Sequence, residues 1–293
     1  MEEFDRATAP EPPMRVLVGL LGREIQLSRS PQMHEDEARA HGIDLKYELF
    51  DFAALGKAET DLPGFIEQLE RSGFAGVNVT HPFKQAVIPL LDELSDGARK
   101  IGAVNTIAFG TGRRLGYNTD VTGFAESFRR GLPNARLARI VQTGAGGAGA
   151  ATAHAMLELG ADHICLVDPD ADRASQLCEA LQRSYGQSRA SAASSVGEAM
   201  ESADGLINAS PVGMAEYQGS PVPIESLSPH QWVADIVYFP LETELVRKAR
   251  EKGCRVLDGG GMAVFQAAGA FEIFTGLRAD GDRMRARFLE GVE

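Results

Sequence analysis

Short apolar runs alternate with amphipathic segments along the first part of the chain. Apolar runs bounded by turn residues indicate strands, and apolar positions that recur every three or four residues indicate helices. We expect strands at 14–22, 45–52 and 76–80, helices at 30–42 and 62–73, a helical stretch interrupted by Pro89 at 83–94, and a hairpin of 103–109 with 113–119. Alternation of this kind predicts an α/β unit.

A second alternating set follows a helix expected at 121–131. Its strands are expected at 138–144, 163–168, 205–210, 232–238 and 255–259, and its helices at 147–160, 172–186 and 243–253. Strands separated by helices favour a doubly wound parallel sheet covered on both faces. Two further helices, at 262–276 and 280–293, are expected to return and pack on the first unit.

The length of 293 residues favours two domains, so the predicted fold class is a two-domain α/β protein. The expected divisions are a Pro-rich flexible tail at 1–13, a first α/β domain at 14–121, the doubly wound domain at 122–260 and the C-terminal helices at 261–293.

Charge and cysteine content exclude several classes of function. The chain has 29 Lys and Arg against 41 Asp and Glu, and a net charge of −12 argues against a nucleic-acid partner. No apolar run approaches the roughly 18 residues that span a bilayer, so we expect no membrane association and a cytoplasmic location. Cys165, Cys178 and Cys254 are expected to be reduced packing residues, and no metal-ligand spacing is present.

A glycine-rich stretch, VQTGAGGAGAATAHAMLELG, lies between an expected strand and an expected helix. In the G-x-G-x-x-G pattern, Gly144 allows a tight turn, Gly146 lets the backbone approach a pyrophosphate, and Gly149 lets the helix pack closely on the strand. The helix start then offers free N–H groups to the phosphates. A glycine-rich turn without a ligand is the alternative that the spacing alone leaves open.

Asp168 makes the dinucleotide interpretation stronger. It lies 19 residues after Gly149, at the end of the next expected strand, where an acid can bind the adenosine ribose. Domain 122–260 is therefore predicted to be a Rossmann-type NAD-binding domain. A turn or helix-cap role is the alternative for Asp168, and it is favoured for the neighbouring Asp170.

Hydride transfer from an alcohol also needs a group that accepts a proton. Lys84 follows an expected strand in GVNVTHPFKQ, and Asp120 in GYNTD is its natural partner. Taken alone, Lys84 would more often be a solvated surface lysine. We interpret His81, in the same block, as a loop residue.

Seven blocks make the chain similar to the shikimate dehydrogenase family, above all to NAD-dependent quinate/shikimate dehydrogenases. In sequence order they are LSRSP, NVTHPFK, GAVNT, NTD, GAGGAG, NASPVGM and DGGGMAVFQAA. The resemblance implies reversible NAD(P)-linked oxidation of the ring alcohol of shikimate to 3-dehydroshikimate, with quinate as a further substrate. It also implies that domain 14–121 binds the substrate and that the two domains face each other across a cleft.

Carried over to this chain, the resemblance assigns Lys84 as acid/base and Asp120 as the residue that orients substrate and lysine. The implied substrate ligands are Ser28, Ser30, Thr80, Asn105, Tyr238 and Gln266. Each is also an ordinary cap, turn or packing residue. The expected cofactor contacts are Gly144, Ala145, Gly146, Gly147, Gly149, Asp168, Arg173, Asn208, Ser210, Val237 and Gly260.

The chain departs from the family at the end of the strand at 163–168. NADP-using members have Asn-Arg-Thr there, whereas this chain has Asp168, Pro169 and Asp170. Pro169 takes the place of the phosphate-binding arginine and an acid lies on each side of it, which predicts NAD as the cofactor. Ser30 stands where quinate-favouring relatives often have threonine, which leans toward shikimate.

Two other functions stay open. One is a dehydrogenase of aminoshikimate or another cyclohexane polyol acid, and the other is a non-catalytic nucleotide-binding sensor on the same fold. The expected partner is a small-molecule substrate, and the oligomeric state is expected to be a monomer or a homodimer.

Overall fold

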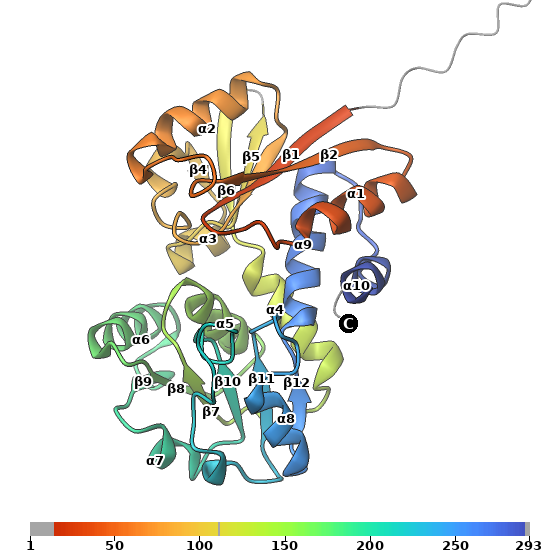
Figure 1. The fold of residues 1–293 in the computed structure, drawn as a ribbon. Coiled ribbons are helices and arrows are strands. Elements are labelled where there is room, and N and C mark those ends of the chain that lie inside the picture. The colour runs from red at the N-terminus through yellow and green to blue at the C-terminus, as the bar shows by residue number, and fades with distance from the viewer. Residues whose placement is uncertain (1–14, 111, 291–293) are drawn as a thin grey trace, which may run out of the picture.

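Two six-stranded sheets, one in each half of the chain, form the framework of the molecule (Figure 1). The computed structural model describes residues 15–110 and 112–290, so the predicted tail at 1–13 lies outside the described residues. The first sheet has the order β2-β1-β3-β5-β6-β4. Its strands are β1 (Arg15–Gly22), β2 (Asp44–Asp51), β3 (Gly76–Val79), β4 (Glu93–Leu94), β5 (Thr106–Gly110) and β6 (Arg113–Tyr117).

The first sheet is mixed rather than fully parallel. β1 pairs parallel with β2 and β3, whereas β5 pairs antiparallel with β3 and β6. Gly110 faces Arg113 at the end of the β5–β6 ladder, which confirms the predicted hairpin. The helices of this half are α1 (Ser30–Ala40), α2 (Leu62–Arg71) and α3 (Asp96–Ile101).

Separate apolar clusters cover the two faces of the first sheet. On one face, Phe65 and Ile66 of α2 pack on Phe52 and Val77. On the other, Val18 packs with residues of α1 and of the C-terminal helix α9 (Gly260–Thr275). Apolar side chains therefore cover the sheet on both sides.

The prediction of a helix at 83–94 is wrong. This segment forms turns, a 3-10 turn at Ile88–Leu90 and strand β4. Pro89 has no N–H to donate within a helix, and Asp92 and Ser95 donate their backbone N–H groups to the β6 carbonyls of Arg114 and Gly116. Strand pairing at the sheet edge therefore replaces the helix.

The second sheet is fully parallel, with the order β12-β11-β10-β7-β8-β9. Its strands are β7 (Arg139–Thr143), β8 (His163–Val167), β9 (Ala190–Ala192), β10 (Gly205–Asn208), β11 (Trp232–Asp235) and β12 (Arg255–Leu257). Its helices are α5 (Gly147–Glu158), α6 (Ala171–Tyr185), α7 (Val196–Met200) and α8 (Glu244–Glu251). This confirms the predicted doubly wound sheet, although β9 and α7 were not predicted.

Two long helices join the halves, α4 (Asp120–Gly131) and α9, which lie side by side between the sheets (Figure 1). Glycines allow their close approach, because a Cβ on Gly123 would lie 2.6 Å from the backbone nitrogen of Gln266. Helix α10 (Gly281–Leu289) packs on α1 and α9, which confirms the predicted return of the C-terminal helices. The domain boundaries at 121 and 260 stay a prediction.

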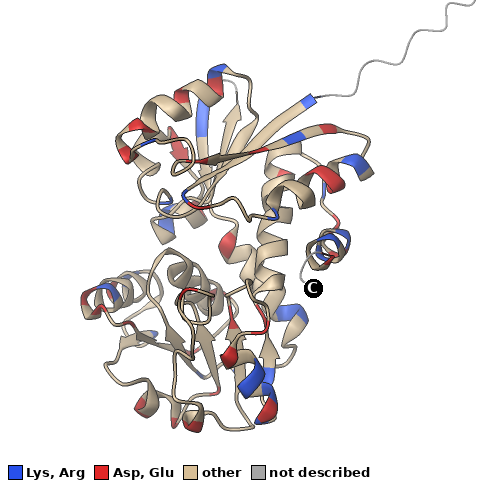
Figure 2. Ribbon diagram, viewed as in Figure 1, with Lys and Arg blue, Asp and Glu red and all other residues tan. Residues whose placement is uncertain are grey.

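Charged residues are scattered over both halves of the described chain (Figure 2). Within that part, no helix is long and apolar enough to cross a membrane, and no group of acidic, histidine and cysteine side chains could hold a metal ion. The three cysteines are free thiols.

Candidate active site

Lys84 and Asp120 meet at the junction of the first sheet with α4. Lys84 lies in the turn after β3, and its Nζ is 2.6 Å from Oδ2 of Asp120, the first residue of α4. The two side chains are 21% and 8% exposed, so the ion pair is largely shielded from water. The backbone N–H of Val104 donates to the Lys84 carbonyl and ties the lysine turn to the GAVNT block.

Asn105 fixes the second oxygen of the Asp120 carboxylate. Its Nδ2 donates to Asp120 Oδ1 and to Thr119 Oγ1, each at 2.9 Å. The position of Asp120 at a helix N-terminus also favours a negative charge. Asp120 therefore faces Lys84 in one defined orientation.

Four other expected substrate ligands lie on separate segments of the chain. Ser28 and Ser30 precede and begin α1, with their hydroxyl oxygens 3.2 Å apart, and both are half-buried. Thr80 directly follows β3, and Gln266 on α9 donates to the Ala263 carbonyl of its own helix at 3.0 Å. Among the described residues, no hydrogen bond joins these four side chains to Lys84 or Asp120.

Tyr238 brings the second half of the chain to the site. It lies in the loop after β11 and is 50% exposed. Partial desolvation raises the pKa of Tyr238, while the charge of Lys84 lowers that pKa and the charge of Asp120 raises it. Tyr238 therefore lies within electrostatic reach of both residues.

The glycine loop has the geometry of a phosphate-binding turn. Gly144 has φ +92°, and a Cβ there would lie 2.5 Å from Ala209. A Cβ on Gly149 would lie 2.2 Å from the Gly144 carbonyl oxygen, whereas Gly146 and Gly147 face open space at the start of α5. The fold needs Gly144 and Gly149, because a side chain at either position would meet backbone atoms. Gly146 and Gly147 leave room for a ligand beside the free N–H groups at the start of α5.

Residues 20–107 match the family described as "Shikimate dehydrogenase substrate binding domain". The chain is also 52% identical over 276 residues to "Shikimate dehydrogenase (NADP(+))" of Streptomyces avermitilis, over 94% of this chain and 95% of that relative. The chain belongs to the shikimate dehydrogenase family. It is therefore an oxidoreductase of that family, which the seven sequence blocks predicted.

Relatives within the shikimate dehydrogenase family differ in the cofactor that they name. "Quinate/shikimate dehydrogenase (NAD(+))" of Corynebacterium efficiens is 45% identical over 277 residues, which are 94% of this chain and 98% of that one. Among solved structures, "Quinate dehydrogenase from Corynebacterium glutamicum in complex with NAD" has a TM-score of 0.90 and 41% identity, and covers 94% of this chain and 99% of its own. Overall similarity therefore does not select between NAD and NADP.

The residues after β8 bear on that choice in this member of the family. Asp168 Oδ2 accepts from the Ala145 N–H in the glycine loop at 2.7 Å, and its Oδ1 accepts from the Asp170 N–H at 2.9 Å. Asp170 caps α6, because its Oδ1 accepts from the Arg173 N–H. The Arg173 guanidinium lies 3.9 Å from Asp168 and 3.5 Å from Asp170, so two acids surround one cation.

The remaining expected cofactor contacts lie at the end of β10, in the loops after β10 and β11, and at the start of α9. A residue that the sequence analysis missed, Asp235, organises this region from the end of β11. It accepts from Asn208 Nδ2 at 2.9 Å, from the Val237 N–H at 3.0 Å and from Thr243 Oγ1 at 2.7 Å. Burial raises the pKa of Asp235 to about 6, against the lowering effect of these hydrogen bonds. The sequence did contain a signal for Asp235, because an acid inside the apolar run WVADIVY is expected to be buried and hydrogen-bonded.

Ser210 and Gly260 lie beside this network. Ser210 Oγ donates to Asn208 Oδ1 at 2.6 Å, which holds the loop after β10. A Cβ on Gly260 would lie 3.2 Å from the Phe288 ring, so a larger residue here would require a small shift of the neighbouring side chains where α9 meets α10.

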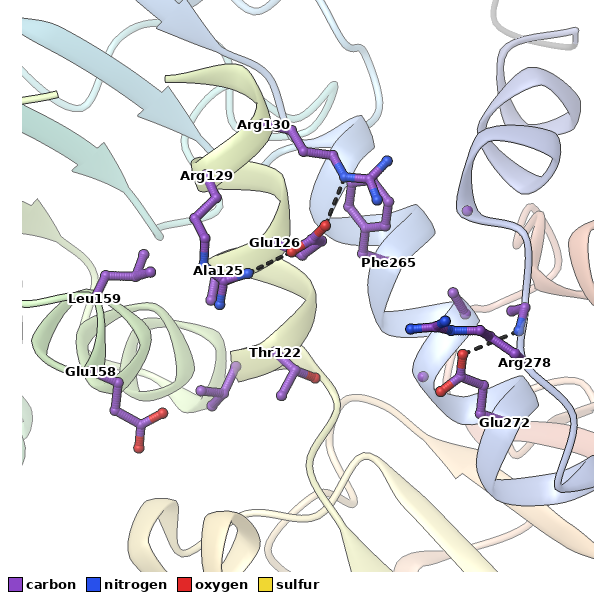
Figure 3. Close-up of a pocket in the computed structure, with 15 residues that line it drawn as sticks. Thr122, Ala125, Glu126, Arg129, Arg130, Glu158, Leu159, Phe265, Glu272 and Arg278 are labelled. Carbon is purple, nitrogen blue, oxygen red and sulfur yellow. Dashed lines mark hydrogen bonds and ion pairs between the residues drawn. The ribbon is translucent and has the colours of Figure 1, made fainter. Parts of the chain in front are cut away.

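A hollow of about 530 Å³ lies apart from these residues, between α4, α9 and the end of α5 (Figure 3). Three arginines and three glutamates line it, and Arg129 and Arg130 both turn toward Glu126. The opposite charges balance, so the lining does not favour a charged ligand. The candidate active site is therefore defined by the Lys84–Asp120 pair and the glycine loop, not by this hollow.

Proposed function

We propose that the chain catalyses the NAD-linked oxidation of the ring alcohol of shikimate to 3-dehydroshikimate, with Lys84 and Asp120 as the catalytic pair. The observation that carries this proposal is the shielded contact of 2.6 Å between Lys84 Nζ and Asp120 Oδ2. A lysine in this setting can exchange a proton with a bound alcohol, whereas a solvated surface lysine would not be held in place.

In the proposed reaction, Lys84 first gives its own ammonium proton to solvent and then accepts the proton of the substrate hydroxyl, as the C–O single bond becomes a carbonyl. The carbon loses its hydrogen as a hydride, which the nicotinamide ring of the bound cofactor accepts. Asp120 stabilises the ammonium that forms on Lys84, and in the reverse direction Lys84 returns the proton to the carbonyl oxygen. Proton and hydride together account for both hydrogens that the alcohol loses.

The glycine loop fits a dinucleotide. Open space at Gly146 and Gly147 lies beside the N-terminus of α5, where backbone N–H groups attract phosphate. Asp168 accepts from the glycine loop with Oδ2 and from the Asp170 N–H with Oδ1, so each oxygen keeps another lone pair for a ribose hydroxyl. Similar proteins with bound NAD or NADP support a nicotinamide dinucleotide in this position.

We propose NAD as the preferred cofactor because of the charges after β8. A 2′-phosphate would meet the carboxylates of Asp168 and Asp170, and Arg173 is already shared between them. Loss of a charge-assisted contact together with added repulsion should cost about 2–4 kcal/mol, or roughly 30- to 1,000-fold in affinity.

Replacement of Lys84 by alanine tests the catalytic pair. The kcat for shikimate oxidation should fall at least roughly 100-fold while NAD affinity stays near wild type, because the residue lies on the substrate side. Lys46→Ala is the matched control, since Lys46 lies on edge strand β2 and pairs with Glu48. An unchanged kcat in Lys84→Ala would remove Lys84 from the mechanism.

A substrate panel separates this proposal from its alternatives. Turnover confined to aminoshikimate or another cyclohexane polyol acid would favour the related dehydrogenase. NAD binding without turnover of any of these acids would favour a sensor on the same fold.

A further inference from the structure

Buried polar side chains from three strands of the first sheet connect in a line to the catalytic pair. Tyr47 on β2 donates to Asn78 Oδ1 at 2.8 Å, and Asn78 Nδ2 donates to Thr106 Oγ1 at 3.0 Å. Thr106 Oγ1 donates to Asn105 Oδ1 at 3.0 Å, and Asn105 Nδ2 donates to Asp120 Oδ1 at 2.9 Å. We call these five residues the relay.

Backbone groups fix the direction of every bond in the relay. Asn105 Oδ1 accepts from the Thr119 N–H at 2.8 Å, so its Nδ2 must be the atom that faces Asp120. Asn78 Nδ2 reaches the Asn105 carbonyl oxygen at 3.4 Å, which makes Asn78 Oδ1 the acceptor for Tyr47. All four protons therefore point toward the Asp120 carboxylate.

Burial keeps water away from the middle of the relay. Thr106 is 0% exposed, and Tyr47 and Asn78 are 5% and 6% exposed, so their polar atoms have little access to water. Burial also raises the pKa of Tyr47, which keeps its hydroxyl protonated as a donor. Hydrogen bonds that run in one direction polarise one another, and the last donor in the line is then strengthened.

We propose that Tyr47, Asn78 and Thr106 are positioning residues that act through Asn105 to hold Asp120 in its orientation toward Lys84. The proposal rests on the proposed function of the Lys84–Asp120 pair. The relay ends on Asp120 Oδ1, and the other oxygen, Oδ2, is then left to face Lys84. A loss of direction at Asp120 would displace the lysine amine from its place beside the substrate hydroxyl.

Thr106→Val removes one hydroxyl and keeps the shape of the side chain, whereas Thr106→Ser keeps the hydroxyl. Breaking the relay should lower kcat roughly threefold to tenfold with KM for shikimate within about twofold, and serine should restore most of kcat. Thr275→Val is the control, because its hydroxyl donates to the Phe271 carbonyl on α9 outside the relay. It should leave kcat within about twofold of wild type.

A double-mutant cycle tests whether the effect travels along the relay. Tyr47→Phe should lower kcat by roughly twofold to fivefold in the wild-type background and have almost no effect on top of Thr106→Val. Independent structural effects would multiply instead. If Thr106→Val does not fold, Tyr47→Phe alone should still lower kcat without a matching change in KM.

A spectroscopic measurement keeps the test independent of turnover. In ¹H–¹⁵N spectra, the Asn105 side-chain proton donated to Asp120 should lie downfield in wild type and Thr106→Ser, and move upfield in Thr106→Val. This shift without turnover of any acid would support the relay and contradict the proposed function. An unmoved Asn105 signal, a multiplicative cycle, equal loss in Thr275→Val, or no rescue by serine would overturn the relay.

Discussion

Replacement of Asp168 by asparagine and Pro169 by arginine should move the cofactor preference from NAD toward NADP. The change removes the carboxylate that lies beside the expected ribose position and adds a guanidinium that can bind a 2′-phosphate. The new asparagine side chain would keep an acceptor for the Ala145 N–H but would lose the one for the Asp170 N–H. The fold should therefore survive at a cost of about 1 kcal/mol.

The size of the effect follows from the charges near this position. Asp168 and Asp170 share only Arg173, at 3.9 Å and 3.5 Å, so a phosphate with two negative charges meets net repulsion in the wild type. Removal of one acid and addition of one cation should shift the ratio of kcat/KM for NAD over NADP by roughly 30- to 1,000-fold. The shift should be closer to 30-fold at high salt, because Arg173 and Asp170 are exposed and their charges are screened by ions.

Steady-state kinetics with both cofactors at two salt concentrations would measure this ratio. Asp168→Asn alone reports the loss of repulsion, and Pro169→Arg alone reports the added attraction with both loop hydrogen bonds intact. A ratio that stays within about threefold of wild type in the double variant would refute the role given to Asp168.

Four further substitutions test other parts of the structure. Glu37→Gln, which removes the buried charge paired with Arg283, should lower the free energy of unfolding by about 2 kcal/mol at pH 7 in urea titrations. That difference should shrink as the pH falls, since the depressed pKa of Glu37 means that its contribution is lost on protonation. The pKa of Asp235 is raised from 3.8 to about 6, so wild type should lose up to roughly 3 kcal/mol relative to Asp235→Asn as the pH rises from about 4 to 7 in the same titrations. Gly146→Ala should keep the wild-type melting temperature and weaken NAD binding roughly tenfold in calorimetry, whereas Gly149→Ala should lower the melting temperature because its Cβ would meet a carbonyl oxygen at 2.2 Å.

Most of the fold could be predicted from the sequence because its periodic segments are long and bounded by glycine or proline. The helix prediction for 83–94 failed because the apolar residues there are spaced as in a helix. The strand that pairs with this segment, β6, comes about 20 residues later in the chain. Strand β9 has three residues and α7 has five, too few to show a period. Helix α3 was also not predicted. It has a capping serine, Ser95, and Gly102 at its end, but the six residues between them are too few to show a helical period.

The candidate site also has a part that the sequence predicts and a part that it does not. Lys84, Asp120 and the glycines lie in short motifs, so their types and spacing were visible along the chain. Tyr47 and Asn78 are 31 positions apart and meet only because β2 and β3 flank β1 in the sheet. Contacts of this kind depend on strand order, which local patterns do not encode.

The main proposal is that this protein oxidises shikimate with NAD. Its most direct test is steady-state kinetics of the purified wild-type chain with shikimate and quinate, each against NAD and NADP. We predict the highest kcat/KM for shikimate with NAD, at least roughly 30-fold above shikimate with NADP. Equal or better use of NADP, or no oxidation of either acid, would show the proposal to be wrong.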